Sequence, residues 1–250
     1  MENSTDKKMT GGEAIVKSLI NEGVETIFGL PGIQLDPMFN ALHDSSNEIR
    51  VINARHEQGV AYMAFGYAQS TGKPGVYAVV PGPGILNTTA ALSTAYACNS
   101  RVLAITGQIP SSYIGRELGM LHEIPNQLSV LEGLTKFAKR INYPSDAPAI
   151  VSEAFKNMRS GRPRPTAIEM PMDIMWQKSE VMLRKFTHGN SLPAADPDLI
   201  EEAALILGTA KNPVIFVGTG AYEAGEVVTI LAEMLQAPVI FINDPATILI

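Results

Sequence analysis

The stretch Gly75-Val76-Tyr77-Ala78-Val79-Val80 is followed directly by Pro81-Gly82-Pro83-Gly84 and then by residues 85–97, whose composition favours a helix. A nearly all-apolar run of this length is typical of a strand in a parallel sheet that is covered on both faces. Proline and glycine end the strand, and such a turn lets the backbone approach a ligand closely. The segment therefore predicts a strand–turn–helix unit, whose turn is either a tight connection or a binding element.

The same alternation of short apolar runs and longer helical runs extends in both directions along the chain. Thr10 and Glu13 form a capping-box pattern that opens a helix. Further strands are expected at residues 26–28, 50–53, 102–106, 136–141 and 166–170, and further helices at residues 36–43, 56–70 and 147–160. Repeated alternation of strands and helices predicts an α/β fold built on a parallel sheet.

The chain is expected to contain one α/β domain and the beginning of another. The first covers residues 9–177 and follows a flexible tail over residues 1–8. Residues 178–197 are polar, carry two prolines and lack periodicity, which predicts a linker. Residues 198–250 begin a second, Rossmann-like α/β unit with two strands, at 213–217 and 238–242. Two strands rarely make a stable sheet alone, so this unit is expected to be truncated or completed by another chain.

The composition excludes several classes of protein. The 250 residues carry a formal net charge of −6, and basic residues gather only at 159–164, so we expect no nucleic-acid partner. No apolar run reaches the ~18 residues of a membrane span. The polar start has no apolar signal segment, so we expect a cytoplasmic protein with no membrane partner. Four scattered histidines and one cysteine predict no metal site in this chain.

Chemistry is expected at the carboxyl ends of the strands, where open parallel sheets bind ligands. Glu57 begins a helix whose residues 59–68 carry no charge, so this helix is expected to be buried nearly all round. Its carboxylate either stabilises the helix N-terminus or is kept for proton transfer. His122 and Glu123, beyond a long loop over residues 107–120, are either a polar loop pair or an acid–base pair.

Several short motifs stand in a recognisable order. They are Phe28-Gly29-Leu30-Pro31-Gly32, Arg55-His56-Glu57-Gln58-Gly59, Pro81-Gly82-Pro83-Gly84 with Asn87, Thr106-Gly107-Gln108-Ile109-Pro110, and Ser160-Gly161-Arg162-Pro163. With this order and spacing, residues 9–173 resemble the N-terminal pyrimidine-binding domain of thiamine diphosphate (ThDP) enzymes of the acetolactate synthase group. Residues 212–238 resemble the opening of that family's central, nucleotide-like domain, which holds FAD in some relatives.

The resemblance implies roles for individual residues. The family's glutamate that matches Glu57 hydrogen-bonds the aminopyrimidine ring of ThDP, and proton exchange through it lets the ring remove the thiazolium proton. Arg162 matches an arginine that contacts FAD, and His122 is the candidate for handling substrate protons. Contacts to the cofactor or the substrate pocket are also implied for the two matched turns and the asparagine that follows the second one: Pro31, Gly32, Pro83, Gly84 and Asn87.

The implied activity is that of a ThDP-dependent lyase or transferase, either a carboligase or a decarboxylase, acting on a small 2-oxo acid. Leu30 and Leu121-His122 stand where acetolactate synthases commonly have Tyr and Phe-Gln, so the condensation of two pyruvates is not implied. The family binds magnesium and the diphosphate through a third domain, whose Gly-Asp-Gly motif does not occur in these residues. Magnesium would enter with that domain, and a second subunit would complete the site in a homodimer or homotetramer.

Two other interpretations stay open at this point. The chain is alternatively a non-catalytic fragment or a split subunit, which needs a partner chain bearing the diphosphate and magnesium domain. It is alternatively a nucleotide-binding α/β protein that uses Gly218-Thr219-Gly220. That motif lacks the third glycine of a dinucleotide fingerprint, because Glu223 takes its place.

Overall fold

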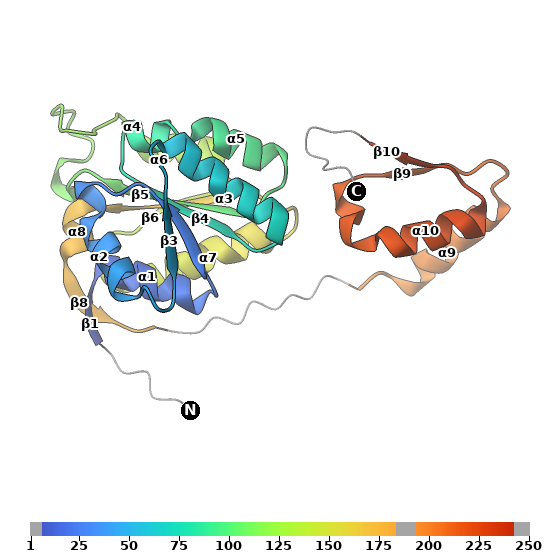
Figure 1. Cartoon of the computed structure of the whole chain (residues 1–250), viewed down its shortest axis with the longest axis horizontal. Coiled ribbons are helices and arrows are strands. Elements are labelled where there is room, and N and C mark those ends of the chain that lie inside the picture. Colours follow the sequence, from blue (N-terminus) through green and yellow to red (C-terminus); the bar gives the residue numbers. More distant parts are fainter. Residues whose placement is uncertain (1–6, 184–193, 243–250) are drawn as a thin grey trace. The chain divides into compact units, whose positions relative to one another are not determined.

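The computed structural model describes residues 7–183 and 194–242 (Figure 1). The chain separates into two compact units, 1–187 and 188–250. Within the described residues, no helix has both the length and the apolar character needed to cross a membrane.

Six parallel strands form the sheet of the first unit, in the order β3-β2-β4-β5-β7-β6. Every residue of β4, β5 and β7 is buried, as expected for strands covered on both faces. The prediction of an α/β fold with a parallel sheet is confirmed. The strands are β2 (Thr26–Gly29), β3 (Arg50–Asn53), β4 (Gly75–Val79), β5 (Val102–Gln108), β6 (Phe137–Arg140) and β7 (Thr166–Pro171).

Helices cover both faces of this sheet (Figure 1). One face packs against α1 (Gly11–Asn21), α2 (Asp36–Asp44) and α7 (Ala147–Arg159), and Phe155 lies fully buried in that core. The other face packs against α3 (Glu57–Thr71), α5 (Thr89–Ala97) and α6 (Gln127–Leu134), with Tyr77 fully buried. Because helices occupy both faces, the loops at the carboxyl edge of the sheet are the elements that are free to build a site.

The capping box predicted for the first helix is present. The Thr10 backbone N–H donates to Glu13 Oε2 at 2.6 Å, and the Glu13 N–H donates to Thr10 Oγ1 at 3.1 Å. These bonds satisfy two amides that have no partner within the helix, an effect worth ~1 kcal/mol for a single cap. Helix α1 therefore begins at the position that its sequence indicates.

A two-stranded antiparallel ribbon changes both expected ends of the first domain. β1 (Lys7–Thr10) pairs with β8 (Lys178–Val181), which follows the short helix α8 (Met172–Trp176). Met9 and Val181 are both buried, so the ribbon adds apolar surface to the core. Residues 7 and 8, which were expected to belong to the tail over residues 1–8, are part of β1 instead. Residues 178–181, which were expected to belong to the linker over residues 178–197, form β8. Residues 1–6 and 184–193 of those segments lie outside the described residues.

The second unit contains α9 (Pro197–Thr209), β9 (Ile215–Val217), α10 (Gly225–Leu235) and β10 (Val239–Phe241). Its two strands pair in parallel, as expected for a βαβ unit. Large apolar side chains stay exposed in it, among them Phe216, Ile230 and Met234. Among its described residues only Val217 and Ala237 are buried hydrophobics, so this unit has almost no closed core of its own.

Candidate active site

The carboxyl edge of the first sheet is divided between β2 and β4, which are neighbours. β2 is followed by the 3-10 helix η1 (Ile33–Leu35) and by α2 on one face, whereas β4 is followed by α4 (Pro83–Leu86) and α5 on the other face. In α/β proteins, ligands bind at the strand ends where the connections of neighbouring strands leave toward opposite faces. The turns at residues 29–32 and 80–84 therefore flank the place where this topology predicts a ligand-binding crevice.

Glu57 lies at this edge as the first residue of α3. The helix is capped by His56, whose Nδ1 accepts from the Gln58 N–H at 3.1 Å. Glu57 is half-buried, and its Oε2 accepts a hydrogen bond from Asn87 Nδ2 at 2.9 Å. Oε1 has no partner among the described residues. The structure thus brings together two of the site residues expected from the sequence, Glu57 and Asn87.

Helix α3 is not buried all round, and that prediction is wrong for the single chain. Val60, Ala61, Ala64 and Ala68 form its buried side, whereas the Tyr62 side chain is 39% exposed. Small alanine side chains let one side of the helix lie close against the sheet, whereas Tyr62 on another side lies 3.3 Å from Thr94 Oγ1 of α5 through its hydroxyl group and stays partly open to solvent. An absence of charge along a helix therefore did not guarantee burial within this chain.

The turn after β4 is held from two sides at Gly82. Its φ of 60° lies in the region that favours glycine, and its N–H donates to Gln127 Oε1 at 2.9 Å. The His122 carbonyl contacts the Gly82 Cα so closely that a Cβ would collide with it. Gly84 faces Val80, since a Cβ built there would lie 2.6 Å from Val80 Cγ2. The turn is thus fixed by a hydrogen bond and by close packing.

His122 reaches the same turn from the long loop after β5. It adopts a φ of 69°, and its Nδ1 lies 2.7 Å from Nε2 of the buried Gln34. When the Gln34 amide donates to Nδ1, the proton of the neutral imidazole stands on Nε2. Among the described residues, Glu123 Oε2 accepts from the Met120 N–H at 2.8 Å and makes no hydrogen bond to His122. The two residues that the sequence offered as a possible acid–base pair thus have different hydrogen-bond partners.

The remaining site residues fall into two groups. Pro31, Gly32 and Pro83 lie in the turns that flank the crevice, and Pro31 and Pro83 are exposed. Arg162 follows α7 and precedes β7, so it lies at the amino edge of the sheet, away from Glu57. Its side chain is exposed, and its carbonyl accepts from Lys136 Nζ at 3.1 Å. The structure does not bring Arg162 into the crevice.

A buried polar network behind the turn was missed by sequence reasoning. Glu169 on β7 is fully buried, and its Oε1 accepts from Arg140 Nε at 2.6 Å. Its Oε2 accepts from Gln127 Nε2 at 2.7 Å. The signal that could have revealed this network is the acidic residue itself, because Glu169 interrupts an otherwise apolar strand and buried charges need partners.

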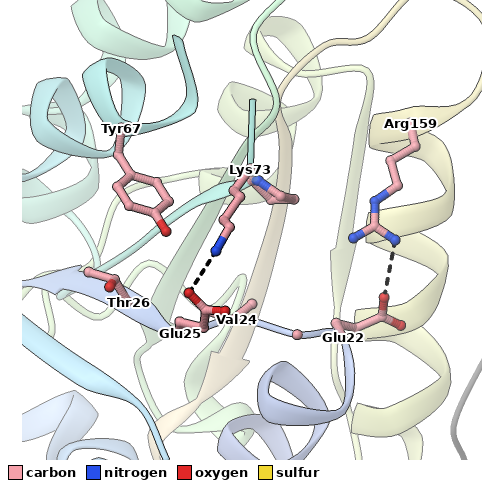
Figure 2. Close-up of a pocket in the computed structure, with 9 residues that line it drawn as sticks. Glu22, Val24, Glu25, Thr26, Tyr67, Lys73 and Arg159 are labelled. Carbon is pink, nitrogen blue, oxygen red and sulfur yellow. Dashed lines mark hydrogen bonds and ion pairs between the residues drawn. The ribbon is translucent and has the colours of Figure 1, made fainter. Parts of the chain in front are cut away.

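The amino edge of the sheet has a cavity of about 220 Å³ (Figure 2). Lys73 Nζ lies 2.7 Å from Glu25 Oε2, and Arg159 Nη1 lies 3.7 Å from Glu22 Oε2. The hydrogen bond that Lys73 donates to Glu25 raises the pKa of Lys73, and burial lowers the pKa of Arg159. Because each cation faces a carboxylate, this cavity offers a ligand no unbalanced charge.

Comparison with known proteins places the chain among enzymes. Residues 9–130 match the family described as thiamine pyrophosphate enzyme, N-terminal TPP binding domain. The chain is 36% identical to a probable 2-ketoarginine decarboxylase of Pseudomonas aeruginosa, over 93% of this chain and 41% of that protein. It is 34% identical to the acetolactate synthase isozyme 1 large subunit of Escherichia coli K12, over 94% of this chain and 41% of that protein.

A probable acetolactate synthase large subunit of Methanocaldococcus jannaschii is 36% identical, over 92% of this chain and 40% of that protein. The chain thus spans about two fifths of the length of these curated relatives. The matched family segment contains Glu57, Asn87 and His122. The resemblance seen in the order of the motifs is confirmed: residues 9–130 belong to the N-terminal TPP-binding domain family of thiamine pyrophosphate enzymes, and the chain is similar to acetolactate synthase large subunits and to a 2-ketoarginine decarboxylase.

Proposed function

We propose that this chain forms the cofactor-activating part of a ThDP-dependent carboligase or decarboxylase that acts on a 2-oxo acid. Glu57 would be the group that exchanges a proton with the aminopyrimidine ring. The observation that carries the proposal is the hydrogen bond from Asn87 to Glu57 at the crevice. It fixes one oxygen of the carboxyl group, while the other has no partner among the described residues.

The residues around Glu57 fit the pyrimidine end of the cofactor. A carboxylate oxygen accepts from a ring N–H, and the protonated acid donates to a ring nitrogen. Gly84 adds no side chain beside this group, since a Cβ built there would stand 3.9 Å from Glu57 Oε1. Leu86, with 39% of its surface exposed, supplies apolar surface of the kind that a flat ring packs against.

The roles of this chain's own residues follow from these contacts. ThDP, when bound, supplies the carbanion chemistry that breaks or forms a bond next to a carbonyl. Glu57 would hold or release a proton at Oε1, and Asn87 would keep the carboxyl group oriented by donating to Oε2. His122 would present the Nε2 proton of its neutral ring toward substrate, because Nδ1 is engaged by Gln34. Pro31, Gly32, Pro83 and Gly84 would shape the walls of the crevice.

The substrate class and the assembly are further parts of the proposal. The name of the Pseudomonas relative specifies decarboxylation of a 2-keto acid, which supports a small 2-oxo acid as substrate here. Magnesium and the diphosphate would be bound by another domain of the full-length protein or by a second subunit. An FAD contact at Arg162, a homodimer or homotetramer and a cytoplasmic location stay predictions.

The Glu57→Gln substitution tests the role of the carboxyl group. The glutamine keeps the shape and an acceptor for Asn87 but cannot exchange a proton. We expect exchange of the thiazolium C2 proton of ThDP, measured by NMR in the full-length protein with magnesium, to slow by about 10²–10⁴-fold. Glu25→Gln, at the amino edge of the same sheet, is the matched control and should leave this rate unchanged. An unchanged rate in Glu57→Gln would contradict the assignment.

A second candidate function is a split subunit or non-catalytic piece that must bind a partner chain. The exposed apolar side chains of the second unit, such as Phe216 and Met234, favour it. Calorimetry of the full-length protein with ThDP and magnesium distinguishes the two candidates. Tight binding by the full-length protein alone would count against the split-subunit candidate, whereas binding only after a partner chain is added would support it.

A further inference from the structure

Gln127 joins three parts of the first unit through one buried side chain. It is the first residue of α6, and it is 1% exposed. Its Oε1 accepts from the Gly82 N–H at 2.9 Å, and its Nε2 donates to the Gly107 carbonyl at 3.0 Å and to Glu169 Oε2 at 2.7 Å. The turn after β4, the end of β5 and the middle of β7 are therefore connected at a single amide.

The turn that Gln127 holds leads directly to Glu57. Gly82 precedes the one-turn helix α4, and the Leu86 N–H donates back to the Gly82 carbonyl at 3.0 Å. Asn87 ends the same turn, because its N–H donates to the Pro83 carbonyl at 3.0 Å. The Asn87 side chain then donates to Glu57 Oε2. Hydrogen bonds and the backbone of α4 thus connect Gln127 to the carboxyl group of Glu57.

A helix of one turn does not hold its own position, because a single turn fixes several dihedral angles for very few hydrogen bonds. The position of α4 must therefore come from the groups that hold its ends. At the first end these are the Gln127 amide and the His122 carbonyl, which contact Gly82 from different elements. The Gln127 amide is in turn oriented by Glu169, which Arg140 holds at 2.6 Å.

We propose that Gln127 is a positioning residue for Glu57, which acts by fixing Gly82 and hence the α4 turn that presents Asn87. This inference rests on the proposed function of Glu57 in cofactor activation. Without the Gln127 amide, the Gly82 N–H and the Gly107 carbonyl lose a buried partner, and α4 gains freedom to shift. Asn87 then no longer holds Glu57 Oε2 in one orientation.

Gln127→Met is the informative variant, because methionine has a similar length and volume but makes none of the three hydrogen bonds. The matched control is Thr135→Val at the other end of α6. Thr135 is also buried, and its Oγ1 donates to the Leu131 carbonyl at 2.7 Å and lies 3.1 Å from the Phe137 carbonyl, away from the turn. Both variants remove buried hydrogen bonds from the same helix, but only one removes them from Gly82.

The first readout is amide hydrogen–deuterium exchange of the full-length protein without cofactor. In Gln127→Met the amides at Gly82 and residues 84–87 should exchange at least about tenfold faster than in the wild type, because a buried hydrogen bond has been removed. In Thr135→Val these amides should keep their wild-type rates. Unchanged exchange at the turn in Gln127→Met would overturn the proposal, and so would an equal increase in both variants.

The second readout is C2-proton exchange of ThDP in the same proteins with magnesium. Gln127→Met should slow it by about tenfold in the wild-type background and should have no further effect in Glu57→Gln, since coupled residues are not additive. Slowing by the same factor in both backgrounds would overturn the proposal and leave the role of Glu57 intact. If the C2 proton of ThDP exchanged no faster in the wild-type protein than in free ThDP, the proposed function would be overturned, and this inference with it.

Discussion

At the amino edge of the six-stranded sheet, charged side chains are held by opposite charges, whereas at the carboxyl edge a carboxylate and a backbone turn are held by neutral amides. Lys73 faces Glu25 and Arg159 faces Glu22 at the first edge (Figure 2). At the second edge, Asn87 holds Glu57 and Gln127 holds Gly82. The two edges belong to the same strands, so the difference comes from the loops and not from the sheet.

The difference bears on what each edge can do. At the amino edge, Glu25 and Glu22 already face cations. At the carboxyl edge, the Asn87 amide orients the carboxyl group of Glu57 through Oε2, and Oε1 has no partner among the described residues. The Arg140–Glu169 ion pair lies behind the turn, and Gln127 connects it to Gly82. At the carboxyl edge, the ion pair that stabilises the fold, Arg140 with Glu169, is therefore distinct from Glu57, the group proposed to move protons.

The largest effect on stability is expected at Glu169. Glu169→Ala should lower the free energy of unfolding by about 3–5 kcal/mol, because it leaves the Arg140 guanidinium without its carboxylate and removes one of the three partners of the Gln127 amide. Chemical denaturation of the first unit measures this. The control at the other edge is Glu25→Ala, which removes an exposed carboxylate and should change the unfolding free energy little. Equal losses of unfolding free energy in Glu169→Ala and Glu25→Ala would show that the two edges do not differ in how they stabilise the fold.

A double variant sharpens the same prediction. Replacing Arg140 and Glu169 together by methionine removes both charges, so no unpaired ion is left in the interior. The loss of stability should then be clearly smaller than in Glu169→Ala. A double variant that is as unstable as the single one would mean that packing at Glu169, and not charge pairing, holds the network together.

Features that depend on neighbouring residues could be predicted from the sequence. The capping box at Thr10 and the buried strand at residues 75–79 could be predicted because the residues that form them are close together in the chain. The Glu57 motif was readable from its resemblance to the family, and the crevice at its position followed from strand–helix alternation. Local chemistry and periodicity therefore predicted the sheet, whereas the role of Glu57 rests on the resemblance and stays a prediction.

Features that depend on distant partners could not be predicted. Gln127 and Gly82 are 45 residues apart, and Gln34 and His122 are 88 residues apart. β8 was expected to be part of a linker, because four residues are too few to show an alternating pattern and their partner lies near the start of the chain. No local signal links such pairs, so the supports of the site appear only when the fold brings them together.

Packing around Val80 should give an intermediate effect. Gly84→Ala places a Cβ 2.6 Å from Val80 Cγ2 and should cost about 1–3 kcal/mol of stability through overpacking. Adding Val80→Ala removes the atom that the new Cβ meets, and should restore part of that loss. Thermal denaturation of the two single variants and the double variant measures the coupling. Additive losses would show that the turn is held by its hydrogen bonds alone.

The smallest effect is expected at Lys73, on the amino edge. The side chains of Lys73 and Glu25 are 52% and 66% exposed, and such surface pairs contribute little to stability. Lys73→Met should therefore leave both the unfolding transition and C2-proton exchange unchanged. The pair is still detectable by titration: because the hydrogen bond that Lys73 donates to Glu25 raises the pKa of Lys73, Glu25→Gln should lower that pKa in an NMR titration of the amine. A loss of activity in Lys73→Met would mean that the amino edge takes part in the chemistry, and the division between the two edges would fail.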